Sequence, residues 1–229
     1  MRNTFVIFKK EAGSYFNSAV AYFNIIAYLA VSGWLFFWLG FFFERKQTEM
    51  TYFFSLMPWL FLFFIPAMTM RLWAEEKKMG TVEILMTLPI RSHEVVLGKF
   101  LASFLVLVLM IILSFPLPLA LNSLGNPDNG QIFTSYLGLI LVGAAYIAIG
   151  LCASTFTSDQ VIAFVVGIIA SFAMLVIGFV PWLRDFGLSY HFNSITRGVV
   201  DSRDLIYYFS VIGFFLYLSV LSVESKRWR

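Results

Sequence analysis

The sequence contains little charge, since Lys, Arg, Asp and Glu make up 13% of its 229 residues, against about 25% in an average soluble protein. Apolar residues make up 60%, and 27 of them are phenylalanines. A soluble domain of this length has too small an interior to bury so much apolar surface. The composition therefore excludes an ordinary water-soluble enzyme, a disordered chain and a fibrous repeat, and it indicates a membrane protein.

Residues that bind metals or nucleotides are also scarce. Cys152 is the single cysteine, which excludes an internal disulfide and a cysteine-cluster metal site. The two histidines, His93 and His191, fall in different connectors, and we expect each to be a polar loop residue rather than a metal ligand. The chain contains no phosphate-binding loop, because Gly98-Lys99 is followed by Phe100 and no glycine stands five residues before Gly98.

Six stretches without charged residues are long enough to cross a bilayer. They contain 19 to 26 residues each, and a helix needs about 20 residues to span a hydrocarbon core of about 30 Å. The stretches are 20–43, 52–70, 100–121, 133–158, 160–183 and 205–223. Because they are too long for strands and do not alternate, we predict an all-α membrane protein with six transmembrane helices.

The connectors indicate one membrane domain, residues 1–229, with no appended catalytic module. The longest connector, 71–99, is shorter than the roughly 40 residues below which soluble domains rarely fold alone. No apolar core follows Arg2 before residue 20, so we expect no cleaved signal peptide. Connectors on the side of the two termini contain 11 Lys and Arg residues and the opposite connectors contain 5, which predicts that both termini are cytoplasmic.

Inside the six stretches there is no Asp, Glu, Lys, Arg or His. Such residues within a membrane usually mark an ion pathway or a catalytic group. Their absence argues against a proton-driven carrier, a voltage sensor and an intramembrane metalloprotease. Prolines at 58, 66, 116 and 118 predict kinks in the second and third helices, either as ordinary membrane-helix bending or as part of a bundle that opens and closes.

Small residues recur at a spacing of four in the fourth and fifth stretches. They are Ala144, Ala148 and Cys152 in the fourth, and Ala163, Gly167 and Ser171 in the fifth. Such ridges allow helix backbones to approach closely. We therefore predict packing inside the bundle, with a subunit interface as the alternative, and a tight helical turn at 155–160.

The N-terminal segment predicts an amphipathic helix. Its apolar face contains Phe5, Phe8, Ala12, Phe16 and Ala19, and its polar face contains Asn3, Lys10, Ser14 and Asn17. Val6 and Ile7 interrupt this pattern. We expect an interfacial helix on the cytoplasmic leaflet, and the alternative is a simple extension of the first span.

The cytoplasmic connector 71–99 contains a second short helix. Gly80 is a natural break, and 81–88 is expected to be helical, with Thr81 as its N-terminal cap and Glu83 near the positive end of its dipole. Pro89 ends it. A further helix, capped by Ser92 with Glu94 in its first turn, leads into the third span.

The short helix is too apolar for a free loop. Val82, Leu85 and Met86 form a stripe, and Ile84 and Leu88 extend it. Such a stripe lies on lipid, packs under the bundle, or docks into a groove of another protein. A partner that moved this helix would tilt the second and third spans, so we interpret it as a lever.

This connector resembles the coupling segment of type-2 ABC exporter permeases. The shared pattern is an acidic-basic run, Gly-Thr-x-Glu-x-Leu, Thr-x-Pro and then Gly-Lys, which here begins at Glu75 and ends at Gly98-Lys99. A second block, which includes His191, Arg197, Asp201 and Arg203, and the C-terminal segment 224–228 resemble the gliding-motility-associated branch of that family.

The resemblance implies a permease without its own motor, not an enzyme. Two copies of a separate ABC ATPase would bind ATP and Mg²⁺, and this chain itself would bind no cofactor. The ATPase-coupling residues would be Gly80, Thr81, Val82, Glu83, Ile84, Leu85, Met86, Leu88 and Pro89. A second permease is implied, identical or related with an extracytoplasmic domain, in a bacterial cytoplasmic membrane and without a nucleic-acid partner.

The outer connector 184–204 contains three Arg, three Asp and one His among apolar residues. We expect short, partly buried helices there, with local ion pairs such as Arg197 with Asp201, and recognition of a substrate or partner is the alternative.

Together with the six spans, the resemblance implies the permease subunit of an ABC transporter, most simply an exporter. The alternative is a membrane anchor or mechanical subunit of an ATPase-driven motility or assembly complex, and the cargo stays open.

Overall fold

The computed structural model describes residues 2–38, 50–83, 89–124 and 127–227, and all regular secondary structure in these ranges is helical. Six helical segments there are long and apolar enough to cross a membrane. They are Ala19–Phe37, Thr51–Lys78, Ser92–Ala120, Asn129–Phe156, Gln160–Phe179 and Ser202–Ser225. The prediction of an all-α protein with six spanning helices is therefore confirmed.

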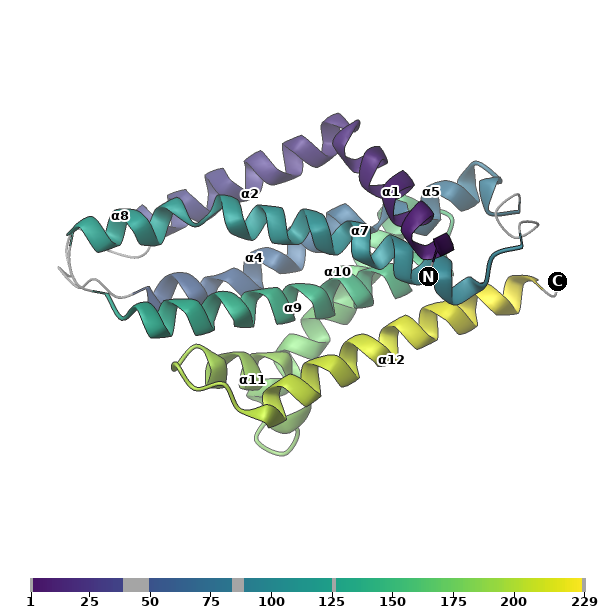
Figure 1. Cartoon of the computed structure of the whole chain (residues 1–229). Helices are drawn as coiled ribbons and strands as arrows, with labels where there is room; N and C mark the ends of the chain where they lie inside the picture. The colour runs from purple at the N-terminus through teal and green to yellow at the C-terminus, as the bar shows by residue number, and fades with distance from the viewer. Residues whose placement is uncertain (1, 39–49, 84–88, 125–126, 228–229) are drawn as a thin grey trace.

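Figure 1 shows an elongated bundle with both chain termini at one end, which we call the proximal end. The helices are α1 (Arg2–Phe16), α2 (Ala19–Trp38), α4 (Thr51–Thr69), α5 (Arg71–Lys78), α7 (Ser92–Leu113), α8 (Pro116–Leu124), α9 (Asn129–Phe156), α10 (Gln160–Val176), α11 (Leu188–Ile195) and α12 (Ser202–Arg227). Two 3₁₀ turns, η1 (Ile177–Phe179) and η2 (Arg184–Phe186), precede α11. Helices α1 and α5 lie at the proximal end, and α8 and α11 lie toward the opposite, distal end.

Helix α9 forms the core of the bundle and packs against α4, α7, α10 and α12. Ala144, Ala148 and Cys152 are buried along it. On α10, Ala163, Gly167 and Ser171 are the buried residues of its first three turns, and a methyl group added to Gly167 would lie 3.3 Å from the Pro66 ring on α4. The two ridges of small residues thus lie at helix contacts within the chain, where small side chains permit close approach.

The helix ends have local causes. Asp159, the single charged residue between the fourth and fifth spans, accepts backbone hydrogen bonds from Val161 (2.8 Å) and Ile162 (3.2 Å), and so caps α10. The third span divides at its distal end, because α7 ends at Leu113 and α8 begins at Pro116. Proline suits a first helical turn, where its missing N–H is not needed.

The start of α7 differs from the predicted start in the residue that caps it. Arg91, not Ser92, is the cap: Ser92 is already helical, and the Arg91 backbone N–H donates to the Glu94 carboxylate (3.3 Å). In a capping box the acid stands three residues after the cap, which fixes the cap at 91. Because α7 begins at Ser92, the helix of the third span also includes Lys99, which precedes the charge-free stretch 100–121.

Helix α1 packs along the first turns of α7. Ile7, Glu11 and Tyr15, at a spacing of four, are buried, whereas Phe5 and Phe16 are exposed. Ile7, which interrupts the predicted apolar face, is therefore an anchor of the contact.

Glycine is required opposite Ile7. A methyl group added to Gly98 would lie 2.7 Å from Ile7 Cγ2 and 3.1 Å from the Thr4 carbonyl oxygen. The first distance is too short for two carbon atoms, and the second is tighter than most contacts of a carbon atom. Gly98 therefore permits the close approach of α1 to α7, and the next residue, Lys99, is a buried cation.

We expect the Gly98→Ala substitution to lower the free energy of unfolding by about 1–3 kcal/mol, because the added methyl group overpacks the contact between α1 and α7. Thermal unfolding of the purified chain in detergent measures the change. Gly213→Ala in α12 is the matched control, since nothing lies within 4 Å of its added methyl group. Adding Ile7→Ala to Gly98→Ala should recover part of the loss, and equal unfolding temperatures for Gly98→Ala and Gly213→Ala would contradict the assignment.

Candidate functional site

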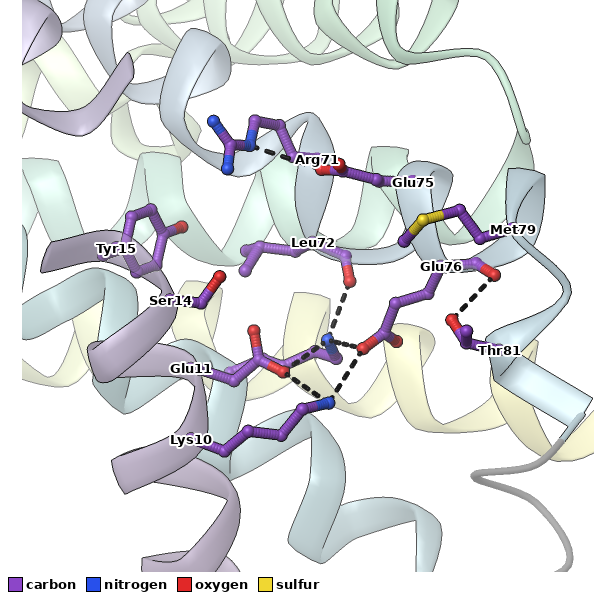
Figure 2. Close-up of a pocket in the computed structure, with 11 residues that line it drawn as sticks. Lys10, Glu11, Ser14, Tyr15, Arg71, Leu72, Glu75, Glu76, Met79 and Thr81 are labelled. Atoms are coloured by element: carbon purple, nitrogen blue, oxygen red, sulfur yellow. Dashed lines mark hydrogen bonds and ion pairs between the residues drawn. The ribbon is translucent and has the colours of Figure 1, made fainter. Parts of the chain in front are cut away.

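A polar pocket of about 280 Å³ lies at the proximal end, between α1, α5 and α7. Charged residues of both signs line it, as Figure 2 shows. The lining residues are Lys10, Glu11, Ser14, Tyr15, Arg71, Leu72, Glu75, Glu76, Met79, Thr81 and Lys99. This pocket is adjacent to the Gly80 break, so the charged residues lie where the predicted coupling segment begins.

Lys99 is the centre of these contacts and is almost completely buried, with 1% of its side chain exposed. Its ammonium group donates to Glu11 (3.1 Å), to Glu76 (2.9 Å) and to the Leu72 carbonyl oxygen (2.8 Å). An ammonium group has three N–H donors, so all three are used. The Trp73 ring lies 5.0 Å from the same nitrogen, close enough for a cation–π contact.

Lys10 completes an alternating group that we call the Lys99 cluster: Lys10, Glu11, Glu76 and Lys99. The Lys10 ammonium lies 3.7 Å from the Glu11 carboxylate and 3.6 Å from the Glu76 carboxylate. Because the Lys10 side chain is 65% exposed, solvent screens its contribution. The buried part of the cluster, Lys99 with its two carboxylates, joins α1, α5 and α7.

Two further polar contacts join α1 to its neighbours. The Tyr15 hydroxyl donates to the Met68 carbonyl oxygen at the end of α4 (3.1 Å) and lies 3.0 Å from the Ser103 hydroxyl on α7. Burial raises the pKa of Tyr15, so its hydroxyl stays protonated and able to donate. Arg71 pairs with Glu75 (3.4 Å) and donates to Ser18, which lies between α1 and α2 (3.1 Å).

The junction between α4 and α5 is held by a side chain of α9. In a continuous α-helix the Ala74 N–H would donate to the Met70 carbonyl oxygen. Instead, the Ser154 hydroxyl accepts from the N–H groups of Ala74 (3.1 Å) and Trp73 (3.0 Å) and donates to the Met70 carbonyl oxygen (3.1 Å). A side chain inserted into the backbone ladder bends a helix, and it also fixes α5 to α9.

The predicted coupling residues are only partly within the described ranges. Gly80 adopts φ +70°, a left-handed conformation that suits glycine, and it follows α5. Thr81 is already helical, and its hydroxyl donates to the Glu76 carbonyl oxygen (3.2 Å), so the structure shows it tied back to α5 and not standing before the helix as a cap. Val82 is half-buried against the core, and Glu83 and Pro89 are exposed.

The remaining predicted coupling residues, Ile84, Leu85, Met86 and Leu88, lie outside the described ranges. Their apolar stripe therefore stays a prediction from the sequence. Thr81 lines the polar pocket, which places the N-terminal end of this segment beside it.

At the distal end, His191 is a buried residue of α11, not the polar loop residue that was expected. Its Nδ1 lies 2.7 Å from the Asp204 carboxylate, its Nε2 lies 2.9 Å from the Asp185 carbonyl oxygen, and its ring stacks on Tyr207 with centroids 4.0 Å apart. It fixes α11 to the start of α12. Among the described residues, no group of three or more metal-ligating side chains occurs.

The other predicted outer residues are exposed and separate. Arg197 and Asp201 do not form the expected ion pair within the part of the chain that is described, because α11 ends at Ile195 and Gly198 adopts φ +90°. The spacing of four residues therefore has no helical geometry there. Asp201 instead accepts a hydrogen bond from the Arg203 backbone N–H (3.0 Å) at the start of α12.

We expect Lys99→Met to lower the free energy of unfolding by about 3–5 kcal/mol, because it leaves two carboxylates without their buried partner. Thermal unfolding measures the loss, and Lys78→Met, at an exposed position of α5, is the control. The triple variant that adds Glu11→Gln and Glu76→Gln should recover much of the stability. An unchanged unfolding temperature for Lys99→Met would show that the cluster is not a structural constraint.

A second prediction concerns the bend between α4 and α5. Ser154→Ala leaves two buried N–H groups without an acceptor, which costs about 1–3 kcal/mol for each unsatisfied group unless the helix straightens. We expect a lower unfolding temperature and a changed distance between spin labels placed on α5 and α9. Ser210→Ala, whose exposed hydroxyl bonds only within α12, should change neither quantity. An unchanged label distance together with an unchanged unfolding temperature would contradict the role of Ser154.

The family of the chain follows from its similarity to known proteins. No curated protein is significantly similar to the chain. A family model described as ABC-2 family transporter protein matches residues 43–189, a region that includes α4, α5, α7, α9 and α10. The matched domain is a membrane permease component and not a nucleotide-binding domain, and with six apolar helices it makes this chain a membrane protein. Because the match covers more than half of its residues, the chain belongs to the ABC-2 family of transporter proteins.

Proposed function

We propose that the chain is the permease subunit of an ABC exporter, driven by a separate ATPase that binds the segment 80–89 at the proximal end. One observation carries this proposal. Helix α5, which leads into that segment, is attached by Lys99 to α1 and α7 and by Ser154 to α9. A force applied to the segment would therefore reach three neighbouring helices, α1, α7 and α9, through buried polar contacts.

The contacts define a path for the movement. Thr81 is bonded to the Glu76 backbone, the Glu76 carboxylate binds Lys99, and Lys99 stands in the second turn of α7. Through the same ammonium group the path reaches Glu11 and α1. Displacement of residues 81–83 would thus rotate α5 and tilt α7, the third span, together with α1; the lever predicted from the sequence moves the second and third spans.

The position of α9 supports a translocation path outside this single bundle. Its residues are buried over most of its length by α4, α7, α10 and α12, and large side chains such as Tyr146 and Leu139 are completely buried on it. A bundle whose central helix is packed on several sides leaves its interior to side chains. We propose that cargo passes between this chain and a second permease, identical or related.

The remaining assignments follow from the sequence and stay proposals. Two ATPase subunits would bind ATP and Mg²⁺, and the complex would lie in a bacterial cytoplasmic membrane with both termini of this chain in the cytoplasm. The excess of Lys and Arg in the connectors on the side of the termini supports this orientation. Membership of the gliding-motility branch rests on the resemblance of the segment that begins at His191.

Substitution of Glu83 and Leu85 by alanine tests the proposed ATPase contact. We expect the double variant to weaken co-purification of the cognate ATPase and stimulated ATP hydrolysis by at least about tenfold, since interface anchors contribute more than about 1 kcal/mol each. The unfolding temperature should change little, because Glu83 is exposed.

The matched control is Asp201→Ala with Leu183→Ala, an acidic and an apolar residue that are both exposed toward the distal end. That variant should bind and stimulate the ATPase like the unchanged chain. Normal binding and normal stimulation by the Glu83 and Leu85 variant would exclude the segment as the ATPase contact.

A further inference from the structure

Helix α1 separates two pockets of opposite character. On one flank lies the polar pocket of the Lys99 cluster, and on the other lies an apolar groove of about 590 Å³ between α1 and α7. Eight residues line the groove, and all of them except Thr4 are apolar. They are Thr4, Phe5, Phe8, Leu97, Leu101, Phe104, Leu105 and Val108. A groove of this composition offers an occupant dispersion contacts and almost no hydrogen bonds.

The length of the groove matches one leaflet of a bilayer. Its α7 wall runs from Leu97 to Val108, which is eleven residues or about 16 Å along a helix. Half of a hydrocarbon core is about 15 Å thick. The groove begins near the proximal end of α7 and follows the helix for about the thickness of one leaflet. An acyl chain of that leaflet would run along the same path.

The walls are open to the surroundings of the bundle. Phe5 is 64% exposed, and Leu97 and Leu101 are 40% and 42% exposed. These leucines belong to a segment long and apolar enough to span a membrane, so the groove is continuous with a surface that faces lipid. A lipid chain is therefore the occupant that this surface meets.

A basic side chain stands beside the groove. Lys9 follows Phe5 by one helical turn and so lies on the same flank of α1. It is exposed, and within the described part of the chain it forms no ion pair. Glu94, the acid in the first turn of α7, is engaged by the Asn3 side chain (3.1 Å) and by the Arg91 backbone. Lys9 is thus available to an anionic group at the membrane surface.

From these observations we propose that the groove between α1 and α7 binds one acyl chain of an anionic phospholipid, with Lys9 contacting its phosphate. The bound chain would pack against Phe8 and Leu101 and hold α1 against α7, on the flank opposite the Lys99 cluster. The site does not depend on the proposed ATPase contact, because both of its walls belong to this chain.

The test uses the full chain in nanodiscs of phosphatidylcholine that contain spin-labelled phosphatidylglycerol. Leu101→Trp fills the groove, and we expect it to remove one motionally restricted lipid per chain from the spectrum. Ile112→Trp is the matched control, since Ile112 is exposed on the same helix outside the groove, and it should leave the restricted fraction unchanged.

Lys9→Gln tests the headgroup contact at an exposed position. We expect it to lower the preference for phosphatidylglycerol over phosphatidylcholine about fivefold, as loss of one surface cation should, while Arg203→Gln leaves that preference intact. An unchanged restricted fraction in Leu101→Trp, or an unchanged preference in Lys9→Gln, would overturn the proposal. A photo-crosslink from position 105 to a second copy of the chain, and not to lipid, would also overturn it.

Discussion

The arrangement of the proximal end depends on one buried positive charge. A lysine that is almost completely buried requires that every N–H donor be bonded and that its charge be compensated. Lys99 meets both requirements only while α1 supplies Glu11 and α5 supplies Glu76 and the Leu72 carbonyl oxygen. The three helices are therefore held in one relative position, because displacement of any one of them would leave a charge without its partner.

The rest of the bundle is organised around helix α9, which contributes small residues where helices approach closely and one hydroxyl where a helix bends. Ala144 and Ala148 lie at buried contacts, and Ser154 bonds to the backbone at the start of α5. Polar contacts thus concentrate at the proximal end, and apolar close packing fills the centre.

The six apolar helices were predictable because length and lack of charge are local properties of the sequence, and the turn at Asp159 was predictable because one residue supplies the cap. The Lys99 cluster was not, because its members lie far apart in the sequence and on three helices. The buried position of Glu11 was not predictable either, because an acid is expected to point to solvent unless a partner for it is known. His191 was missed for this reason as well, since its carboxylate partner, Asp204, lies on another helix.

The hydroxyl of Ser154 has a mechanical consequence for the second membrane segment. It bonds to the backbone at Met70, Trp73 and Ala74, where α4 ends and α5 begins, and so ties this junction to α9 through three hydrogen bonds. Since α9 is the most buried of the six apolar segments in the described ranges, this junction is anchored in the interior of the bundle.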